Sequence, residues 1–547
     1  MVGVPGKSQG CNTCRRRKVK CDLEKPHCRR CVSSARQCEG YERYAVFINR
    51  GQQGLQKRER LEEARIPTTS IPSALGFQYA NTPLNFSPSP RQANETQLIS
   101  SFWETYCASA TRYPAPTEPA WLYRSISSAT TPTTVTAAPS MLLKQALLSL
   151  AYIRIGRLND DQALIIRGQQ IYGQSLRLMQ HALRDPVLAH NDDILVAARC
   201  MVLYESFEST SGDMAAWENH ILGIARIIHL RGVHQTRDPI SRSVLESIRY
   251  NVMIVSLMRS TSCFLGESEW LTVPWAGVSK SLDQRLFDYG FTLAYMMQRS
   301  ETISMSTSLS VPSQHRHQEL HQSASKRQTI IDILEQTLSC YIGLANLRSE
   351  LLATRRQKLR VVNPPSIQSQ QLYDEDTTTD EQHMHLARAD NDPQAISFAI
   401  LLALELSFSI FATALVQHLP DDHDHDYAHG HGHDHGRDLG HDPTRHSPRD
   451  LFAQLAEYMA PARRLQLGQQ LLRHLQLCCA VRSEHLRPRI IFPLNVLRWE
   501  MRHRPAEAAQ VRALFEAVAS RGKFRIAKGA QNAGTEIVPG IVLESER

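Results

Sequence analysis

The sequence predicts a mostly α-helical protein with a small N-terminal module that has no hydrophobic core of its own. The chain has 547 residues, of which 42% are hydrophobic and 21% charged, so it can bury more than one core usually organises. From residue 93 onward, apolar residues recur at helical spacing and strand-like alternation is scarce. In contrast, six of the twelve cysteines fall within residues 11–38.

These N-terminal cysteines follow a regular pattern. The triplet C-x2-C-x6-C occurs twice, with an offset of 17 residues. The start of the chain, Met1–Pro5, leads into no apolar segment typical of a secretory signal, so clustered thiols are expected to bind metal rather than form disulfides. The predicted ligands are Cys11, Cys14, Cys21, Cys28, Cys31 and Cys38.

The number of thiols indicates how many metal ions they hold. Zinc takes four tetrahedral ligands, so six cysteines are too many for one ion and too few for two separate sites. Two Zn²⁺ ions fit if two thiolates bridge both metals. The repeat makes the bridging pair equivalent positions, and Cys11 and Cys28 are the natural choice. A segment this short has no independent core, so metal binding is expected to supply much of its folding free energy.

Positive charge is concentrated in the same window. Residues 11–38 contain nine basic and two acidic residues, a balance of +7, which leaves +1 of the formal +8 for the rest of the chain. Six thiolates with two Zn²⁺ carry −2, so the assembled module stays at about +5. A basic block on a near-neutral body indicates a polyanionic partner for the block alone.

The cysteine spacing and the basic run together resemble the fungal-type Zn(II)2Cys6 binuclear cluster transcription factors. The basic positions of that pattern are filled here by Arg15, Arg17, Lys18 and Lys20, and Pro26 lies in the loop where the family has a proline. The resemblance also implies that the first and fourth cysteines bridge the two metals. It implies a nuclear, RNA polymerase II type transcription factor that reads CGG-like triplets in double-stranded DNA.

The two halves of the module differ in charge. Five of the six residues between the second and third cysteines are basic, whereas "VSSARQ", between the fifth and sixth, contains one arginine. The first half is therefore expected to enter the major groove, where arginine and lysine suit guanine O6 and N7. We expect Arg17 and Lys18 to contact bases and Arg15, Arg16 and Lys20 to contact phosphates. A nuclear-import signal alone would not need a zinc scaffold.

The domain boundaries follow from composition. We expect a DNA-binding domain at 1–45, a largely disordered linker at 46–92, an α-helical regulatory domain at 93–530 and a tail at 531–547. No heptad seam is found at 55–66, so no dimerising zipper is predicted. A monomer on one triplet and a homodimer joined through the helical domain both remain open, and the transcription machinery is a further expected partner.

The predicted helices of the body rest on apolar periodicity, with Asn94, Pro139-Ser140 and Asn191–Asp193 as start signals. One begins near Asn94, and the others span Met141–Arg157, Asp161–Arg184, Ile194–Phe207, Met214–Leu230, Ser241–Cys263, Ile330–Leu352, Ala395–Gln417, Leu451–Cys479 and Ala506–Ala519. Three segments resemble the fungal-specific regulatory domain that accompanies the cluster: Trp217–Gly232, Ser256–Trp270 and Phe492–Glu500.

Core packing explains most of these residues without a functional role. Trp217, Ile221, Ile224 and Ile228 form a buried stripe at helical spacing. The histidines of the same segment, His220 and His229, are expected to be satisfied core residues. The six cysteines outside the module are expected to be small buried hydrophobes. No nucleophile elbow, phosphate loop or catalytic carboxylate pair occurs, so no enzymatic activity is predicted.

Three segments of unusual composition interrupt this pattern. Ala395–Val416 is long enough to cross a membrane, but Glu405 at its middle favours a central buried helix, and no membrane partner is expected. The acidic stretch 372–382 is interpreted as a solvated loop. The histidine-rich stretch 418–446 is interpreted as a disordered insertion with incidental metal affinity.

Two other functions compete with transcription regulation. A metal-responsive or metal-buffering protein could use the thiolate cluster and the histidine-rich stretch, but the large near-neutral body and the asymmetric basic run argue against it. RNA binding or nonspecific DNA binding by the basic block predicts no sequence preference. The target genes, the effector, and activation or repression are not encoded in any recognisable pattern.

Overall fold

The computed structural model divides into two compact units, Met1–Leu84 and Asn85–Arg547. The residues it describes are 11, 13–14, 17, 19–24, 28–34, 36, 38, 90–107, 121, 138–208, 214–308, 316–362, 393–417, 419, 448–479 and 487–521, with only the backbone at some helix ends. The acidic stretch 372–382, the tail 531–547, most of the predicted linker and all of the histidine-rich stretch except Leu419 lie outside the described residues.

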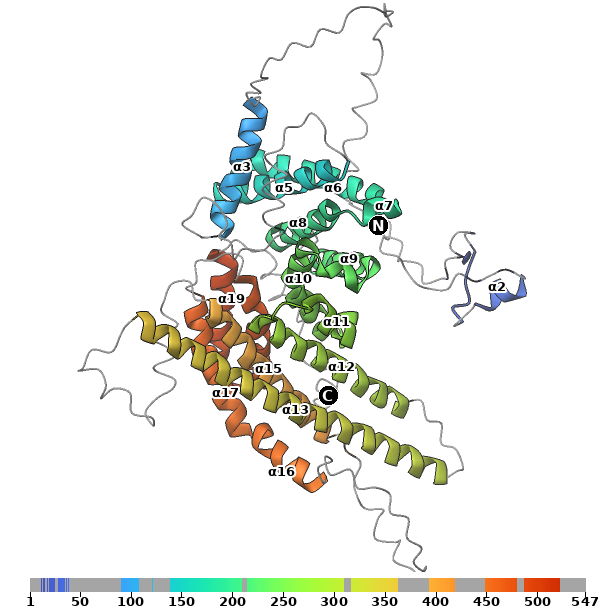
Figure 1. The fold of residues 1–547 in the computed structure, drawn as a ribbon. Helices are drawn as coiled ribbons and strands as arrows, with labels where there is room; N and C mark the ends of the chain where they lie inside the picture. Colours follow the sequence, from blue (N-terminus) through green and yellow to red (C-terminus); the bar gives the residue numbers. More distant parts are fainter. Residues whose placement is uncertain are drawn as a thin grey trace, which may run out of the picture. The chain divides into compact units, whose positions relative to one another are not determined.

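Helices form the second unit, the body, and the described part of the chain contains no strand. The mostly α fold class is therefore confirmed. The longer helices, shown in Figure 1, are α3 (Pro90–Cys107), α5 (Ala138–Leu158), α6 (Gln162–Ala182), α8 (Asp192–Glu208), α9 (Ala215–Arg231), α10 (Pro239–Met258), α12 (Leu282–Ser308), α13 (Arg316–Val362), α15 (Pro393–Gln417), α16 (Pro448–Met459), α17 (Pro461–Cys478), α18 (Ile491–Glu500) and α19 (Pro505–Arg521). Short helical turns join them: α7 (Pro186–Ala189), η4 (Val233–Arg237), η5 (Phe264–Gly266), α11 (Ser268–Thr272), η6 (Val273–Trp275) and η8 (Arg487–Ile490).

Side-chain caps account for several helix starts. The Asp161 carboxylate accepts hydrogen bonds from the backbone N–H groups of Ala163 (2.9 Å) and Leu164 (3.1 Å), which satisfies two of the free donors of α6. Asn191 Oδ1 accepts from the N–H of Asp193 (2.8 Å), as the sequence predicted for α8. Asn94 was wrong as a start signal, because α3 already begins at Pro90.

Prolines and mixed composition explain where predicted and observed helices differ. The single helix expected at Leu451–Cys479 is two helices, α16 and α17, because Pro461 lacks the N–H that a continuous helix needs and instead fits the first position of α17. Helix α13 extends far beyond the expected Ile330–Leu352. Helices α12 and α18 were not predicted as helices.

Helix α15 lies at the centre of the C-terminal half of the body. It packs against α12, α13, α16, α17 and α18, which explains why apolar residues cover its whole circumference. Its segment Ala395–Gln417 is long and apolar enough to cross a membrane, but 89% of its most apolar window is buried inside the body. The interpretation of this segment as the central buried helix is confirmed.

The polar residues of α15 are paired. Glu405 forms a salt bridge with Arg348 of α13. Burial raises the pKa of the Glu405 carboxyl, although the positive charges of Arg348 and Arg463 act to lower it. Ser409 donates to the Tyr458 carbonyl (2.7 Å), and Ser397 donates to Asp283. Buried polar groups cost little when they are hydrogen-bonded, so these residues are compatible with a core helix.

A buried polar cluster joins α6, α8 and α9. The Tyr172 hydroxyl donates to the Glu205 carboxylate (2.8 Å) and lies 2.8 Å from His220 Nε2. A hydroxyl has one proton, so His220 Nε2 is the donor in its contact with Tyr172. The His220 ring is 3.8 Å from Glu205, close enough for an ion pair, yet burial dominates and lowers the pKa of His220 to about 4. His220 is therefore a neutral, satisfied core residue, as predicted.

The other predicted core residues are partly confirmed. Trp217, Ile221, Ile224 and Ile228 are all buried. His229, however, is exposed at the last turn of α9 and stacks on Phe264 at 4.4 Å between ring centroids, so it was wrong as a core histidine. Of the scattered cysteines that the structure describes, three are buried (Cys200, Cys340, Cys478) and two are half-buried (Cys263, Cys479); the side chain of Cys107 lies outside the described residues.

Candidate metal centre and nucleic-acid interface

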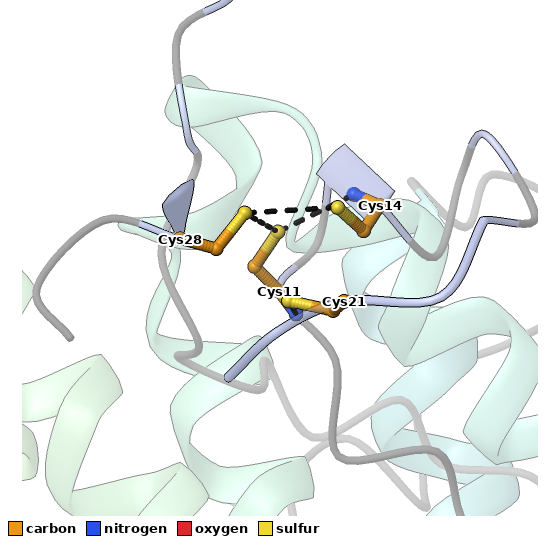
Figure 2. Close-up of side chains that lie close together, drawn as sticks. All are labelled: Cys11, Cys14, Cys21 and Cys28. Atoms are coloured by element: carbon orange, nitrogen blue, oxygen red, sulfur yellow. Dashed lines mark hydrogen bonds between the residues drawn. The ribbon is translucent and has the colours of Figure 1, made fainter. Parts of the chain in front are cut away.

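All six cysteines of the N-terminal window converge on one point of the first unit. Five of them are buried, and Cys21 is half-buried. Figure 2 shows Cys14, Cys21 and Cys28 around Cys11. Among the described residues, Val19 packs against this group of cysteines and Thr13 is also buried. The first unit is therefore organised around thiols rather than around apolar side chains.

The thiols form two groups of four that share two members. One group contains Cys11, Cys14, Cys21 and Cys28, and within each group all sulfur atoms lie within 4.8 Å of one another. The other group is Cys11, Cys28, Cys31 and Cys38. The shared thiols are thus Cys11 and Cys28, the pair that the repeat made the natural bridging choice.

The distances between sulfur atoms suit tetrahedral zinc. A tetrahedron with Zn–S bonds of about 2.3 Å has edges of about 3.8 Å. Sγ of Cys11 is 3.6 Å from Sγ of Cys28 and 3.8 Å from Sγ of Cys31, and Sγ of Cys14 is 3.7 Å from Sγ of Cys28. Ligand type, number, sharing and spacing therefore all fit two Zn²⁺ ions.

The backbone repeats along with the sequence. The Cys11 and Cys28 sulfurs each accept a hydrogen bond, at 3.3 Å, from the N–H of the cysteine three residues later. The second cysteine of each half accepts a hydrogen bond at its backbone carbonyl from the N–H five residues later. Val19 N–H donates to the Cys14 carbonyl at 3.0 Å, and Arg36 N–H donates to the Cys31 carbonyl at 3.0 Å. The shared thiols thus cap two equivalent helical turns, the second of which is α2 (Arg29–Ser33).

Burial makes a nearby cation necessary for these thiols to act as thiolates. It raises the pKa of the Cys11 thiol to about 12 and also raises the pKa values of Cys14 and Cys28. A coordinated Zn²⁺ supplies the compensating charge and stabilises the thiolate. Backbone N–H groups that point at Cys11 and Cys28 assist, because they favour negative charge at the sulfur.

The predicted DNA contacts are only partly described. Arg17 and Lys20 are exposed at the surface of the module, while Arg15, Arg16 and Lys18 lie outside the described residues. The N–H of Arg17 donates to the Thr13 carbonyl (3.2 Å), four residues earlier. Three basic side chains of the second half, Arg29, Arg30 and Arg36, are also exposed.

Asp22 has a structural role in the module that the cysteine pattern does not predict. Its carboxylate accepts three backbone hydrogen bonds, from Glu24 (3.1 Å), Arg29 (3.1 Å) and Arg30 (2.7 Å). Desolvation acts to raise the pKa of Asp22, but these bonds together outweigh it and lower the pKa. The sequence signal for this role was an acid that directly follows the third cysteine. It lies six residues before Cys28, which is the N-cap of α2.

A cysteine module of this kind, followed by a large helical body, defines the class of fungal zinc-cluster proteins. Residues 9–45 match the model of the fungal Zn(2)-Cys(6) binuclear cluster domain, a domain that binds two zinc ions. Residues 98–403 match the fungal specific transcription factor domain, which is more than half of the chain. The chain therefore belongs to the family of proteins with a fungal specific transcription factor domain.

Curated relatives resemble the chain over limited stretches. The aspercryptin biosynthesis cluster-specific transcription regulator of Emericella nidulans is 64% identical over 39 residues, 7% of this chain and 6% of the relative. The arginine metabolism regulation protein II of Saccharomyces cerevisiae is 64% identical over 33 residues, 6% of this chain and 4% of the relative. An uncharacterized protein of Emericella nidulans is 28% identical over 116 residues, 21% of this chain and 24% of the relative. The chain thus covers a quarter or less of the length of these relatives, and no solved structure matches it.

Proposed function

We propose that the protein is a sequence-specific, DNA-binding transcription factor of the RNA polymerase II type, and a pathway-specific regulator. The observation that carries this proposal is the pair of four-thiol groups that share Cys11 and Cys28. The family of the chain and the name of a relative, a cluster-specific transcription regulator, support it. A metal buffer would have no use for a large helical body.

The proposed zinc ligands are the six cysteines of the module. One Zn²⁺ is held by Cys11, Cys14, Cys21 and Cys28 and the other by the second group, so Cys11 and Cys28 bridge the two ions. The role of the zinc is structural: every ligand position is filled by a thiolate, and none is left open for a substrate. The metal ions thus replace the hydrophobic core that so short a segment lacks.

The proposed DNA interface is the first half of the module. Arg17 and Lys18 contact the base edges of a CGG-like triplet in the major groove, while Arg15, Arg16 and Lys20 contact phosphates. The exposure of Arg17 and Lys20 supports this assignment, since both side chains are available to a partner. The second half has "VSSARQ" in place of the basic run, so it contributes less to base recognition.

The proposed organisation assigns DNA binding to residues 1–45, a linker to 46–92 and regulation to the helical domain at 93–530, followed by the tail 531–547. The protein acts in the nucleus, and its further partners are the transcription machinery and a second copy bound through the helical domain. No catalytic activity is part of the proposal.

The test is a DNA-binding titration of the zinc-loaded full-length protein. One labelled duplex carries a CGG triplet, and a second has the triplet scrambled within identical flanks. We expect at least about tenfold tighter binding to the CGG duplex, because each mismatched base pair costs roughly 1–3 kcal/mol. Equal affinity for both duplexes would contradict sequence-specific recognition and favour nonspecific binding. Tight zinc binding without DNA binding would favour the metal buffer.

A further inference from the structure

Asp22 connects the two halves of the cysteine module. It directly follows Cys21, which belongs to the first four-thiol group only. Its carboxylate accepts hydrogen bonds from the two residues after Cys28, the cysteine that belongs to both groups. Oδ1 accepts from the N–H groups of Glu24 and Arg29, both at 3.1 Å, and Oδ2 accepts from the N–H of Arg30 at 2.7 Å. One carboxylate thus spans the loop between the third and fourth cysteines.

The first turn of α2 is capped by this carboxylate and a thiol together. The N–H groups of Arg29 and Arg30 donate to Asp22, and the N–H of Cys31 donates to the Cys28 sulfur at 3.3 Å. All three N–H donors of this turn are therefore satisfied. Because α2 carries Cys31, any displacement of the turn also displaces a ligand of the second group.

The backbone beside Asp22 is held in an unusual conformation. Leu23 has φ of 67°, a left-handed value that a branched apolar residue seldom adopts. This turn lets the Asp22 carboxylate accept the N–H of Glu24 while it also reaches α2. Such a conformation persists where surrounding interactions fix it. Here these are the three bonds to Asp22 and an exposed ion pair across the same turn, in which Arg29 Nε lies 3.3 Å from Glu24 Oε2.

The repeat of the cysteines extends to this position in the sequence. The residue 17 positions after Asp22 is Glu39, which directly follows Cys38 as Asp22 directly follows Cys21. An acid therefore follows the last cysteine of each half, and Asp22 is the one that lies within the described residues.

We propose that Asp22 is a positioning residue of the zinc cluster, which fixes the loop between the two halves and holds α2 so that its thiols face the metal ions. This inference rests on the proposed two-zinc site. Groups that orient metal ligands typically contribute about 10- to 100-fold to metal affinity. The same contacts set the orientation of the second half relative to the first, and hence the shape of the module presented to DNA.

The test compares Asp22→Asn with the matched control Glu24→Gln in the zinc-loaded full-length protein. Both variants remove one negative charge from the same loop. Glu24→Gln retains the backbone N–H that donates to Asp22 and loses an exposed ion pair with Arg29, which contributes little to stability. In Asp22→Asn an amide NH₂ replaces one acceptor oxygen and opposes a backbone donor. Zinc transfer to a chromophoric chelator, hydrogen exchange of the peptide that covers residues 22–31, and affinity for the CGG duplex are measured. Asp22→Glu, which keeps the charge but displaces the carboxylate, separates geometry from charge.

We expect Asp22→Asn to weaken zinc retention about 10- to 100-fold, to speed exchange over residues 22–31 and to weaken DNA binding. Glu24→Gln should stay close to the wild type in zinc retention and bind DNA slightly more tightly, since charge alone favours phosphate contact. Asp22→Glu should fall between them. Equal behaviour of Asp22→Asn and Glu24→Gln, with two zinc ions in the wild type, would overturn this inference alone. A wild type that holds no zinc would overturn the proposed function together with this inference.

Discussion

The two units of this protein reach an ordered structure by different means. In the body, one apolar core extends from α3 to α19 and buries most of the residues of helices such as α8 and α15. In the module, the buried group is five cysteines, with Cys21 and Val19 packed beside them. Burial of apolar side chains stabilises the body directly, whereas the buried thiols of the module are stabilised when they coordinate a cation. One chain thus combines a unit whose core is apolar with a unit whose core is a group of thiols able to bind metal.

Removal of zinc is the largest expected perturbation. A strong chelator should unfold residues 11–38 and abolish specific DNA binding, because the thiolates lose the charge that holds them together. The body contains no comparable group of thiols among its described residues and should keep its helicity. Circular dichroism and a DNA titration, each before and after chelation and after zinc is restored, measure both effects. Loss of body helicity on chelation would remove the distinction between the units.

A large-to-small substitution in the core of the body should destabilise the body and leave the module unchanged. Phe408 of α15 is fully buried, so Phe408→Ala should lower the free energy of unfolding of the body by about 3–5 kcal/mol. Zinc content and the DNA affinity of the native protein should not change. Urea denaturation followed by circular dichroism measures the loss. Ile342→Ala, at a residue of α13 that is 48% exposed, is the control and should cost far less. Zinc loss caused by Phe408→Ala alone would show that the units are coupled.

Acid should weaken the body through His220. Its pKa is about 4 in the folded protein and near 6.5 when unfolded, so below pH 6.5 the unfolded state binds more protons. Stability contributed by the neutral ring is therefore present above pH 6.5 and lost as the pH falls toward 4, by at most about 3 kcal/mol. His220→Gln should flatten this part of the pH profile of urea unfolding. His503→Gln, at an exposed histidine, is the control substitution. Equal profiles for wild type and His220→Gln would contradict the assignment.

Within the module, two substitutions separate base contacts from phosphate contacts. Lys18→Ala should cost about 1–3 kcal/mol on the CGG duplex and reduce the preference for CGG over the scrambled duplex. Arg16→Ala should weaken binding to both duplexes alike and lower the slope of affinity against salt by about one. Titrations at several salt concentrations distinguish the two effects. Arg36→Ala, in the less basic half, serves as a charge-matched control. The same loss on both duplexes for Lys18→Ala would contradict its role in base recognition.

The candidate site was predictable from the sequence because the number of thiols limits how zinc can be coordinated. Six thiols at repeated spacing admit two tetrahedral ions only when two ligands are shared, and symmetry favours Cys11 and Cys28. The capping role of Asp22 was not predictable in this way. It depends on the path of the loop between the third and fourth cysteines and on the left-handed conformation of Leu23, which no periodicity encodes.

The fold of the body was predictable where an apolar pattern is strong and less so elsewhere. Helix α15 was recognised from its length, and its interior position follows from Glu405, whose charge Arg348 compensates. Helix α12 was missed, although Phe287, Phe291 and Ala294 form a buried stripe, because polar residues alternate with them. His229 was misassigned because adjacent residues of a helix face different directions: Ile228 is buried, whereas His229 on the same turn is exposed.

The central claim is that six thiols hold two zinc ions through two shared ligands. Native mass spectrometry of the full-length protein counts the zinc ions in the wild type, in Cys28→Ser and in Cys38→Ser. The wild type should hold two. Cys28→Ser should lose both, because Cys28 belongs to both four-thiol groups, while Cys38→Ser should keep the ion of the group that lacks Cys38. Loss of a single ion by Cys28→Ser, with the same count as Cys38→Ser, would contradict the shared-ligand arrangement.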